Sequence, residues 1–387
     1  MSQWPVYDTE QIEAVAAVLR SGKVNAWTGP DVGDFEKAYC HYTGARHAIA
    51  MANGSVTLDT ALHVLDLQPG DEVIVAPRSF MASASCVLLA GGVPVFADVD
   101  PDTGNITPDT VAPLIGPKTR GILPVHLAGW PCDMDGFMDL AQANNLWVIE
   151  DCAQAHGAQL GDRHVGTIGT FGSFSFCQDK IISTGGEGGM LLCNDDDLWR
   201  RAWSHKDHGK GHANVFDTDH PPGFRWLHNA GPGTNLRMAG PAAVIGRIQL
   251  SHLDDWRAHR ERNARILSGA LSECDALRVP MPPSDITHAW YRFYAFVRPE
   301  ALATDWSRDR ILAEISKAGF PAFSGSCSEI YREETFTSRG LAPEAPLPVA
   351  QALGETSLAF LVDTTWDAER TAKLADTVRD IANRALR

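Results

Sequence analysis

One lysine of this chain follows an alternating apolar segment, where its amine is placed to do chemistry. Residues 173–177, in which serine and phenylalanine alternate before a cysteine, predict a strand, and Lys180 comes just after it. The carboxyl ends of strands in α/β proteins border the crevice that binds ligands, so this amine is expected to face a ligand. The glycine-rich run at 185–189 lets the backbone pass close to a bulky flat group. Taken alone, the segment is more typical of a solvated lysine beside a flexible loop.

A carboxylate, Asp151, ends the apolar run at 147–151. A carboxylate in this position can pair with a protonated pyridine nitrogen and keep such a ring an electron sink. Strand-terminal acids also often cap the next helix, and residues 152–157 offer a helix start. The presence of Lys180 in the same chain favours the pairing with a pyridine ring.

Residues 53–56 form a turn between a predicted strand and a predicted helix. The backbone N–H groups of Gly54 and Val56 and the hydroxyl of Ser55 would face an anion at the helix N-terminus, as in a phosphate cradle. The turn is neither a GxGxxG fingerprint nor a P-loop, which argues against a dinucleotide or ATP. The alternative is that Ser55 is simply the N-cap of the helix.

Phe80 follows another predicted strand, where its ring is expected either to stack on a bound ring or to lie in the core. A reactive amine, a partner for a pyridine nitrogen and a phosphate cradle together predict one cofactor. That cofactor is pyridoxal 5′-phosphate (PLP), held as a Schiff base by Lys180.

The elements that position these residues alternate along the first 200 residues. A helix is predicted over 9–19 and ends at Ser21 and Gly22. Helical patterns then separate seven β-rich runs, which predicts a doubly wound, mostly parallel sheet; the runs are 47–51, 72–76, 93–98, 121–126, 147–151, 173–177 and 189–193.

The remainder predicts a long functional loop and a smaller second domain. Residues 200–235 are rich in His, Gly, Asp and Pro, and a helix begins near Pro241. The last 120 residues or so mix helix and strand and end in an amphipathic helix over 366–386. We expect a large domain over 1–250 and a small C-terminal domain over 251–387.

Composition narrows the classes of function. The 387 residues carry a formal net charge of −15 without a block of Lys or Arg, which argues against nucleic acid or an anionic membrane surface as partner. The N-terminus lacks the pattern of a secretory signal, and no run reaches the length of a membrane span, so a cytoplasmic location is expected. The eight cysteines show no CxxC spacing, and neither a metal site nor a disulfide framework is predicted.

Several motifs and their order resemble the DegT/DnrJ/EryC1/StrS family, the PLP-dependent aminotransferases of nucleotide-linked keto-sugars. The segments that carry this resemblance are 29–36, 53–55, 91–100, 150–157, Lys180 with 186–189, and 234–238. The resemblance implies the aspartate aminotransferase-like fold (fold type I), with a mostly parallel seven-stranded large domain and a smaller α+β C-terminal domain.

The resemblance also implies roles for individual residues. Lys180 matches the Schiff-base lysine, and Asp151 matches the partner of the pyridine nitrogen. The other positions that match cofactor contacts are Gln154 near the phenolic oxygen, Phe80 as the stacking aromatic, and Ser55, the Gly54 and Val56 backbone, and Ser175 at the phosphate. Asn235 matches a residue that reaches the phosphate from a neighbouring subunit, which implies a homodimer with shared sites.

The implied reaction moves an amino group from L-glutamate to a nucleotide-linked keto-sugar. An alternative keeps this chemistry but uses a cyclic ketone without a nucleotide, such as an inositol-like or aminohydroxybenzoate-type ring. PLP-dependent sugar dehydratases of the family carry His at the position of Lys180, so the lysine argues against that reaction. A non-catalytic sensor or assembly protein is a further alternative, which the lysine also disfavours.

The chain departs from the family in three places. Cys177, Gln178 and Asp179 replace the usual residues before the lysine, and Leu236 replaces an aromatic. Residues 320–331 replace a His/Tyr/Pro-rich strand. Contacts to the substrate are therefore expected to differ from those of the family.

Overall fold

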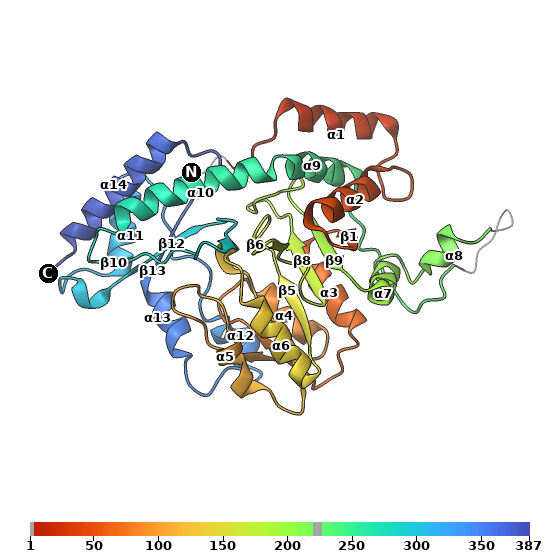
Figure 1. Cartoon of the computed structure of the whole chain (residues 1–387), viewed down its shortest axis with the longest axis horizontal. Coiled ribbons are helices and arrows are strands. Elements are labelled where there is room, and N and C mark those ends of the chain that lie inside the picture. Colours follow the sequence, from red (N-terminus) through yellow and green to blue (C-terminus); the bar gives the residue numbers. More distant parts are fainter. Residues whose placement is uncertain (1–3, 220–226) are drawn as a thin grey trace.

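A seven-stranded sheet forms the centre of the computed structural model, which describes residues 4–219 and 227–387 (Figure 1). The strand order is β1-β9-β8-β5-β4-β2-β3. Within this described part of the chain, every strand of the sheet runs in one direction except β9, which is antiparallel to both neighbours. The strands are β1 (His47–Met51), β2 (Glu72–Val75), β3 (Val93–Phe96), β4 (Thr119–Leu123), β5 (Trp147–Asp151), β8 (Phe171–Ser175) and β9 (Gly189–Cys193).

The predicted mostly parallel sheet is therefore confirmed, and small differences lie at strand ends. β1, β5 and β9 have the predicted bounds, whereas β2 and β3 end slightly earlier. β4 ends at Leu123 because Pro124 has no N–H group to donate to a neighbouring strand. β8 lies two residues earlier than expected, over Phe171–Ser175 instead of 173–177, so Lys180 stands in the turn beyond the strand.

Helices cover both faces of the sheet, which explains why most residues of its strands are buried. α2 packs on β1, and α3 packs on β8 and β9. The helices that precede or cover this sheet are α1 (Thr9–Ser21), α2 (Asp31–Thr43), α3 (Gly54–Val64), α4 (Ala82–Leu89), α5 (Pro108–Val111), α6 (Met134–Asn144), α7 (Asp196–Lys206) and α9 (Gly240–Ser251).

Local signals explain where the first helix begins and ends. The side chain of Asp8 accepts a hydrogen bond from the backbone N–H of Gln11, and this N-cap starts α1. Gly22 adopts φ 70° and donates its N–H to the carbonyl of Leu19, as the predicted C-cap requires. The helix runs to Ser21 rather than residue 19.

A second part of the chain is built around a small antiparallel sheet of β10 (Leu277–Arg278), β12 (Phe293–Val297) and β13 (Ser357–Phe360). The long helix α10 (Leu253–Leu271) reaches it from α9 (Figure 1). Its core is built only of residues between Ala264 and Ala385. The other elements are α11 (Arg308–Lys317), α12 (Glu334–Thr337), α13 (Pro348–Thr356), α14 (Ala368–Arg384), and a separate sheet of β6 (Gln159–Leu160), β7 (Arg163–His164) and β11 (Ile286–Thr287).

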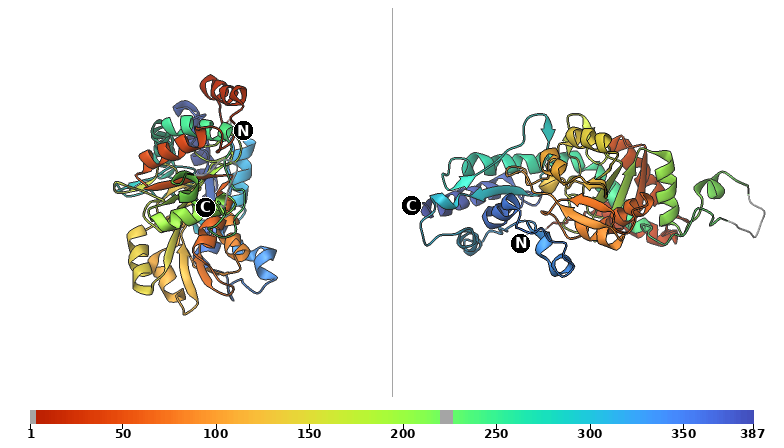
Figure 2. Two further views of the ribbon diagram at one scale, coloured as in Figure 1. Left: turned by 90° about the vertical axis from the view of Figure 1, so that its right-hand side faces the viewer. Right: turned by 90° about the horizontal axis from the view of Figure 1, so that it is seen from below.

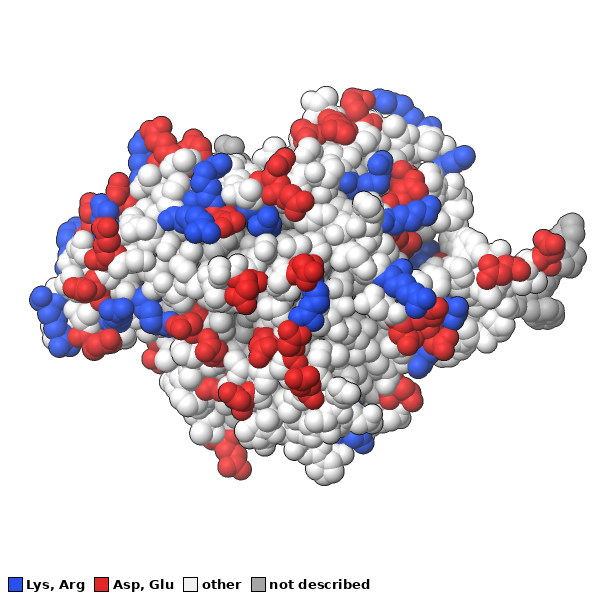
Figure 3. All heavy atoms as spheres, in the orientation of Figure 1, with Lys and Arg blue, Asp and Glu red and all other residues white. Residues whose placement is uncertain are grey.

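The domain boundary near residue 250 stays a prediction. Ile330, Phe336 and Leu353 pack with the core of the seven-stranded sheet although they follow that boundary by many residues. None of the helices in the described residues is long and apolar enough to cross a membrane. Acidic and basic side chains lie next to each other over much of the face in Figure 3. Among the ion pairs of the described residues, Arg257 and Arg265 both pair with Glu261.

The predicted loop over 200–235 is partly wrong. Residues up to Lys206 belong to α7, because Trp199, Ala202 and Trp203 form an apolar stripe that packs against the main core. The short helix α8 (His212–Phe216) follows and stands away from the body in Figures 1 and 2. Residues 220–226 of the predicted loop, like residues 1–3, lie outside the described residues.

Buried hydrogen bonds tie the end of β2 to the C-terminal part of the chain. Arg78 is 1% exposed and donates to the hydroxyls of Ser328 at 2.6 Å and Ser357 at 2.8 Å. The backbone N–H of Ser79 donates to the carbonyl of Cys327 at 3.2 Å. The segment directly before Phe80 is thus held to the C-terminal part of the chain.

Candidate active site

A cavity of about 650 Å³ opens at the edge of the main sheet where the parallel strands end. Because β1, β2, β4, β5 and β8 run in one direction, the residues that follow them meet at this edge. All predicted cofactor residues except Asn235 line the cavity. Its walls are Asn53, Gly54, Ser55, Val56, Leu58, Ser79, Phe80, Ala82, Ser83, Val125, Asp151, Ala153, Gln154, Ser175, Cys177, Asp179, Lys180 and Glu187.

Lys180 points its amine into this cavity from the turn after β8. Its side chain is 14% exposed, and its Nζ lies 3.7 Å from Oδ1 of Asp179 and 4.9 Å from the ring centre of Tyr291. The side chain of Trp4 holds this turn in place, because its indole N–H donates to the carbonyl of Lys180 at 2.8 Å. The amine is therefore shielded from water yet open to the cavity, and the solvated-lysine alternative does not describe it.

Asp179 keeps a negative charge beside this amine. Burial opposes ionisation of Asp179, but Lys180, the hydrogen bond from the phenol of Tyr291, and Arg292 outweigh it and lower the pKa of this carboxyl. Burial raises the pKa of the Tyr291 phenol above its usual value, so Tyr291 remains a donor at neutral pH. The pair fixes one wall of the cavity next to Lys180.

Asp151 lies at the end of β5 and is 5% exposed. Its Oδ2 accepts a hydrogen bond of 2.6 Å from the hydroxyl of Ser83, which in turn contacts the hydroxyl of Ser79 at 2.7 Å. Its Oδ1 accepts the backbone N–H of Ala153 at 3.1 Å. Each carboxylate oxygen can accept a further bond, so the acid can also take the N–H of a pyridinium ring. No helix follows within residues 152–158, so Asp151 is not a helix cap.

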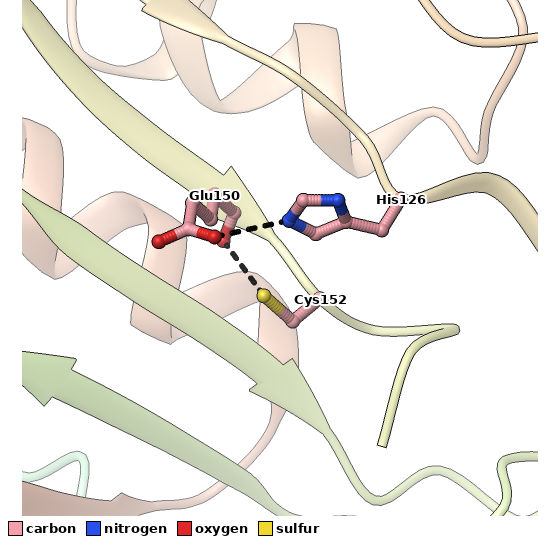
Figure 4. A group of neighbouring side chains, drawn as sticks. All are labelled: His126, Glu150 and Cys152. Atoms are coloured by element: carbon pink, nitrogen blue, oxygen red, sulfur yellow. Dashed lines mark hydrogen bonds and ion pairs between the residues drawn. The ribbon is translucent and has the colours of Figure 1, made fainter. Parts of the chain in front are cut away.

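A buried cluster behind β5 positions this acid (Figure 4). The carboxylate of Glu150 accepts hydrogen bonds from Nε2 of His126 at 3.1 Å and from the backbone N–H groups of Gly166, Ile168 and Gly169. The backbone N–H of His126 donates to the carbonyl of Asp151 at 3.1 Å.

Glu150, His126 and Cys152 also lie close enough together to hold a metal ion. However, both oxygens of Glu150 are hydrogen-bonded, and Nδ1 of His126 accepts the backbone N–H of Cys132 at 2.9 Å. Burial raises the pKa of the Cys152 thiol well above its usual value, which disfavours the thiolate that a metal requires. These contacts favour a structural role for the cluster.

Gln154 and His156 follow Asp151 in the chain. The side-chain oxygen of Gln154 accepts the backbone N–H of Ala128 at 2.7 Å, which leaves the amide NH₂ as the end that can donate to a ring oxygen. His156 is fully buried and bonds the carbonyl of Ser175 and the hydroxyl of Tyr39. Burial lowers the pKa of His156 to about 3, so this ring is neutral and structural.

The turn at 53–56 starts helix α3, and its geometry fits a phosphate. The side chain of Asn53 accepts the N–H of Val56 at 3.0 Å, so Asn53 is the N-cap and the alternative with Ser55 is wrong. The N–H groups of Gly54 and Ser55 have no intrahelical acceptor and remain for an anion, whereas that of Val56 already has a partner. A Cβ on Gly54 would lie 2.6 Å from Cβ of Ser175, so only glycine lets these two segments meet.

Phe80 and Asn235 are both exposed, the first at the wall of the cavity and the second outside it. Phe80 is 70% exposed at the cavity wall, so it is not a core residue. Asn235 is exposed and pairs through its backbone with Asp207, outside the cavity of its own chain. This placement agrees with the predicted role toward a second subunit, which stays a prediction.

Sequence reasoning missed three residues of the site. Ser79 and Ser83 lie four residues apart after β2, so a pair of hydroxyls facing the crevice was readable from their spacing. Tyr291 carries no local signal, because it reaches Lys180 from the C-terminal part of the chain.

The residues present fit PLP: an amine, an acid for the pyridine nitrogen, an amide donor and a helix N-terminus converge on one cavity. The comparisons agree. The chain is similar to GDP-perosamine synthase of Caulobacter vibrioides, with 37% identity over 293 residues that cover 75% of each chain. It is similar to 3-amino-5-hydroxybenzoate synthase of Amycolatopsis mediterranei, with 31% identity over 363 residues that cover 94% of this chain and 90% of that one.

The crystal structure of an aminotransferase from Psychrobacter cryohalolentis is similar over 99% of both chains, with 50% sequence identity and a TM-score of 0.97. The sequence profile of one aminotransferase family matches residues 5–379. On this sequence, this fold and this site, the chain belongs to the DegT/DnrJ/EryC1/StrS aminotransferase family and is a PLP-dependent aminotransferase.

Proposed function

We propose that this aminotransferase moves the amino group of L-glutamate to a keto-sugar that is linked to a nucleotide. The names of its relatives support a sugar acceptor, since GDP-perosamine synthase and a dTDP-amino-sugar transaminase of Streptomyces venezuelae are among them. The observation that carries the chemistry is the convergence of Lys180, Asp151 and the N-terminus of α3 in one cavity.

Each residue has a role that follows from its contacts. PLP, when bound, supplies an electron sink for the negative charge that develops at the donor carbon. Nζ of Lys180 removes a proton from that carbon and later returns one, as a general base and acid. Asp151, held by Ser83 and Ala153, keeps a ring nitrogen protonated.

The remaining residues bind and orient the cofactor. The amide NH₂ of Gln154 donates to the ring oxygen, and the exposed ring of Phe80 covers one face of the site and excludes water. The N–H groups of Gly54 and Ser55, with the hydroxyls of Ser55 and Ser175, hold the phosphate. The Ser175 hydroxyl accepts the N–H of Cys177 at 3.3 Å, which leaves its hydrogen for the phosphate.

The test begins with the absorption spectrum of the purified protein with PLP. We expect a visible band that L-glutamate shifts, and a Lys180→Ala variant in which neither the band nor the transfer of the amino group remains at the wild-type level. A Lys180→Ala protein with a full rate of transfer would contradict the role of the lysine. A panel of nucleotide-linked keto-sugars, assayed with L-glutamate, then identifies the acceptor.

A cyclic ketone without a nucleotide is the second candidate acceptor. The similarity to 3-amino-5-hydroxybenzoate synthase favours it, and residues 320–331 differ from the family pattern. Including inositol-like and aminohydroxybenzoate-type ketones in the same panel separates the two acceptors, because a nucleotide-free ketone that reacts faster than every sugar nucleotide rules out the first.

The proposed active unit is a homodimer whose two sites are shared. Asn235 is exposed, lies outside the cavity of its own chain and pairs through its backbone with Asp207, and so is available to a partner's phosphate. Mixing a Lys180→Ala chain with an Asn235→Ala chain should restore activity, because a mixed dimer has one intact site. Light scattering that gives a monomer would overturn this arrangement. The cytoplasmic location stays a prediction from the sequence.

A further inference from the structure

A smaller cavity of about 220 Å³ lies beside the cavity of Lys180, and the two share the wall made by the Asp179–Tyr291 pair. Tyr291 lines the smaller cavity and bonds Asp179, which lines the larger one. The smaller cavity is otherwise lined by Arg292, Tyr294, Phe323, Gly325, Ser326 and Ala359.

Arg292 is the cationic residue of this lining. It is partly buried, and its Nη1 donates to the carbonyl of Tyr291 at 2.9 Å. The charge of Arg292 helps to lower the pKa of Asp179, but among the described residues no carboxylate is close enough to form an ion pair with its guanidinium. The partly buried Arg237 and Arg308, in contrast, each pair with an aspartate. A guanidinium has five N–H donors, so most of them remain for an anion.

The guanidinium lies within reach of the reacting amine. Cζ of Arg292 is 4.2 Å from the ring centre of Tyr291, and Nζ of Lys180 is 4.9 Å from the same centre. The two groups are therefore at most about 9 Å apart, the sum of these distances. An amino acid with a side-chain carboxylate is long enough for this distance, because bonds of about 1.5 Å link its amino group to its far carboxyl and a hydrogen bond of about 3 Å completes the reach. The side chain of Tyr291 must turn out of the wall between the two cavities for one molecule to reach both groups.

The segment that departs from the family pattern builds the outer wall. The backbone N–H of Ser326 donates to the phenol oxygen of Tyr294 at 3.0 Å. Gly325 adopts φ +90°, and a Cβ there would lie 2.4 Å from the Tyr294 ring, so only glycine lets the segment lie flat on this ring. The backbone of Phe323 pairs with that of Ala359 next to β13, which completes a wall that is mainly apolar.

We propose that this cavity binds a carboxylate of the amino donor and that Arg292 is the residue that holds it. The proposal rests on the proposed function. A carboxylate fits better than the diphosphate of a nucleotide, because the lining offers one cation and mainly apolar walls. A diphosphate carries more negative charge than one guanidinium neutralises.

The test measures the donor half-reaction without any acceptor. An Arg292→Gln variant with PLP is mixed with L-glutamate, and the glutamate dependence of the spectral change is recorded. Binding of glutarate, an unreactive dicarboxylate, is measured by calorimetry on the same holoenzyme. Because a hydrogen bond to a charged group contributes about 1.5–3 kcal/mol, both dissociation constants should rise about 10- to 100-fold.

Two further variants separate the loss of a contact to the carboxylate from damage to the fold. Arg292→Lys keeps the charge and should recover part of the loss. Arg310→Gln is the matched control, because Arg310 also lies over an aromatic ring, at 4.1 Å from that of Trp306, but it is exposed and pairs with Asp305. The control should bind glutarate as the wild type does.

An unchanged dissociation constant for glutarate in Arg292→Gln would overturn the proposal. A variant that raises only the KM of the sugar nucleotide would also overturn it and would assign the cavity to the diphosphate. If the wild-type protein shows no spectral change with L-glutamate, the proposed function itself fails. If that change is present and Arg292→Gln keeps the wild-type dependence, only the assignment of Arg292 fails.

Discussion

Replacing Glu150 by Gln tests whether the cluster behind β5 is structural. Glu150 is fully buried, and its two oxygens each accept two N–H donors. Oε2 faces His126 and Gly166, at 3.1 and 2.7 Å. Oε1 faces Ile168 and Gly169, at 2.8 and 2.6 Å. A glutamine must turn its NH₂ group toward one of these pairs, and then donors face donors.

The magnitude follows from the number of bonds lost. His126 cannot turn into an acceptor in place, because its Nδ1 already accepts the N–H of Cys132 and its Nε2 therefore carries the hydrogen. Two hydrogen bonds to a charged acceptor are lost in either orientation. At about 1.5–3 kcal/mol each, Glu150→Gln should lower the free energy of unfolding by roughly 3–6 kcal/mol.

Urea unfolding, followed by tryptophan fluorescence, measures this loss. The control is Glu344→Gln, because Glu344 is exposed and its substitution should change stability by less than about 0.5 kcal/mol. A loss below about 1 kcal/mol in Glu150→Gln would refute the reasoning. Stabilisation of the wild type by Zn²⁺, absent from the variant, would show instead that the cluster binds metal.

Two further predictions concern the cofactor site and its support. Gly54→Ala should weaken PLP binding about tenfold or more in a spectroscopic titration, because its Cβ would lie 2.6 Å from that of Ser175. The control is Gly33→Ala, where a Cβ meets nothing within 4 Å. Equal PLP affinities of the two variants would contradict the steric argument. His156 has its pKa lowered from 6.5 to about 3, so the unfolded chain binds its proton first and stability should fall as pH drops from 6.5 toward 3. In His156→Gln the free energy of unfolding, measured with urea at several pH values, should fall less steeply with decreasing pH. The same pH dependence in the variant and the wild type would show that His156 is not the cause.

The sheet could be predicted from sequence because its strands are buried on both faces and stand out as apolar runs. Because parallel strands end at the same edge of a sheet, the sequence also predicted that Lys180, Asp151 and the turn at 53–56 lie together. The beginning of the loop at 200 could not be placed, since α7 is mostly polar and its apolar stripe is narrow. The capping of α3 by Asn53 rather than Ser55 depends on backbone angles that neighbouring residues do not reveal.

Contacts between distant segments were beyond local reasoning. Tyr291 reaches Lys180, and Arg292 lines a second cavity, because the backbone N–H of Tyr291 donates to the carbonyl of Ala128 and so brings the segment before β12 to the main sheet. No spacing rule connects positions so far apart in the chain. The roles of the site residues remain predictions that the variants above test.

The bonds of Arg78 bear on how substrates enter. A hinge motion that separated the end of β2 from residues 327–328 would pull this guanidinium away from Ser328 and Ser357. It would also break the backbone pairing of Ser79 with Cys327 and of Ile330 with Pro77. Opening the molecule at these contacts would leave the buried guanidinium of Arg78 without hydrogen-bond partners, which is costly. Substrates should therefore enter through small movements of side chains at the mouth of the cavity, above all of Phe80, while the two parts of the molecule stay together.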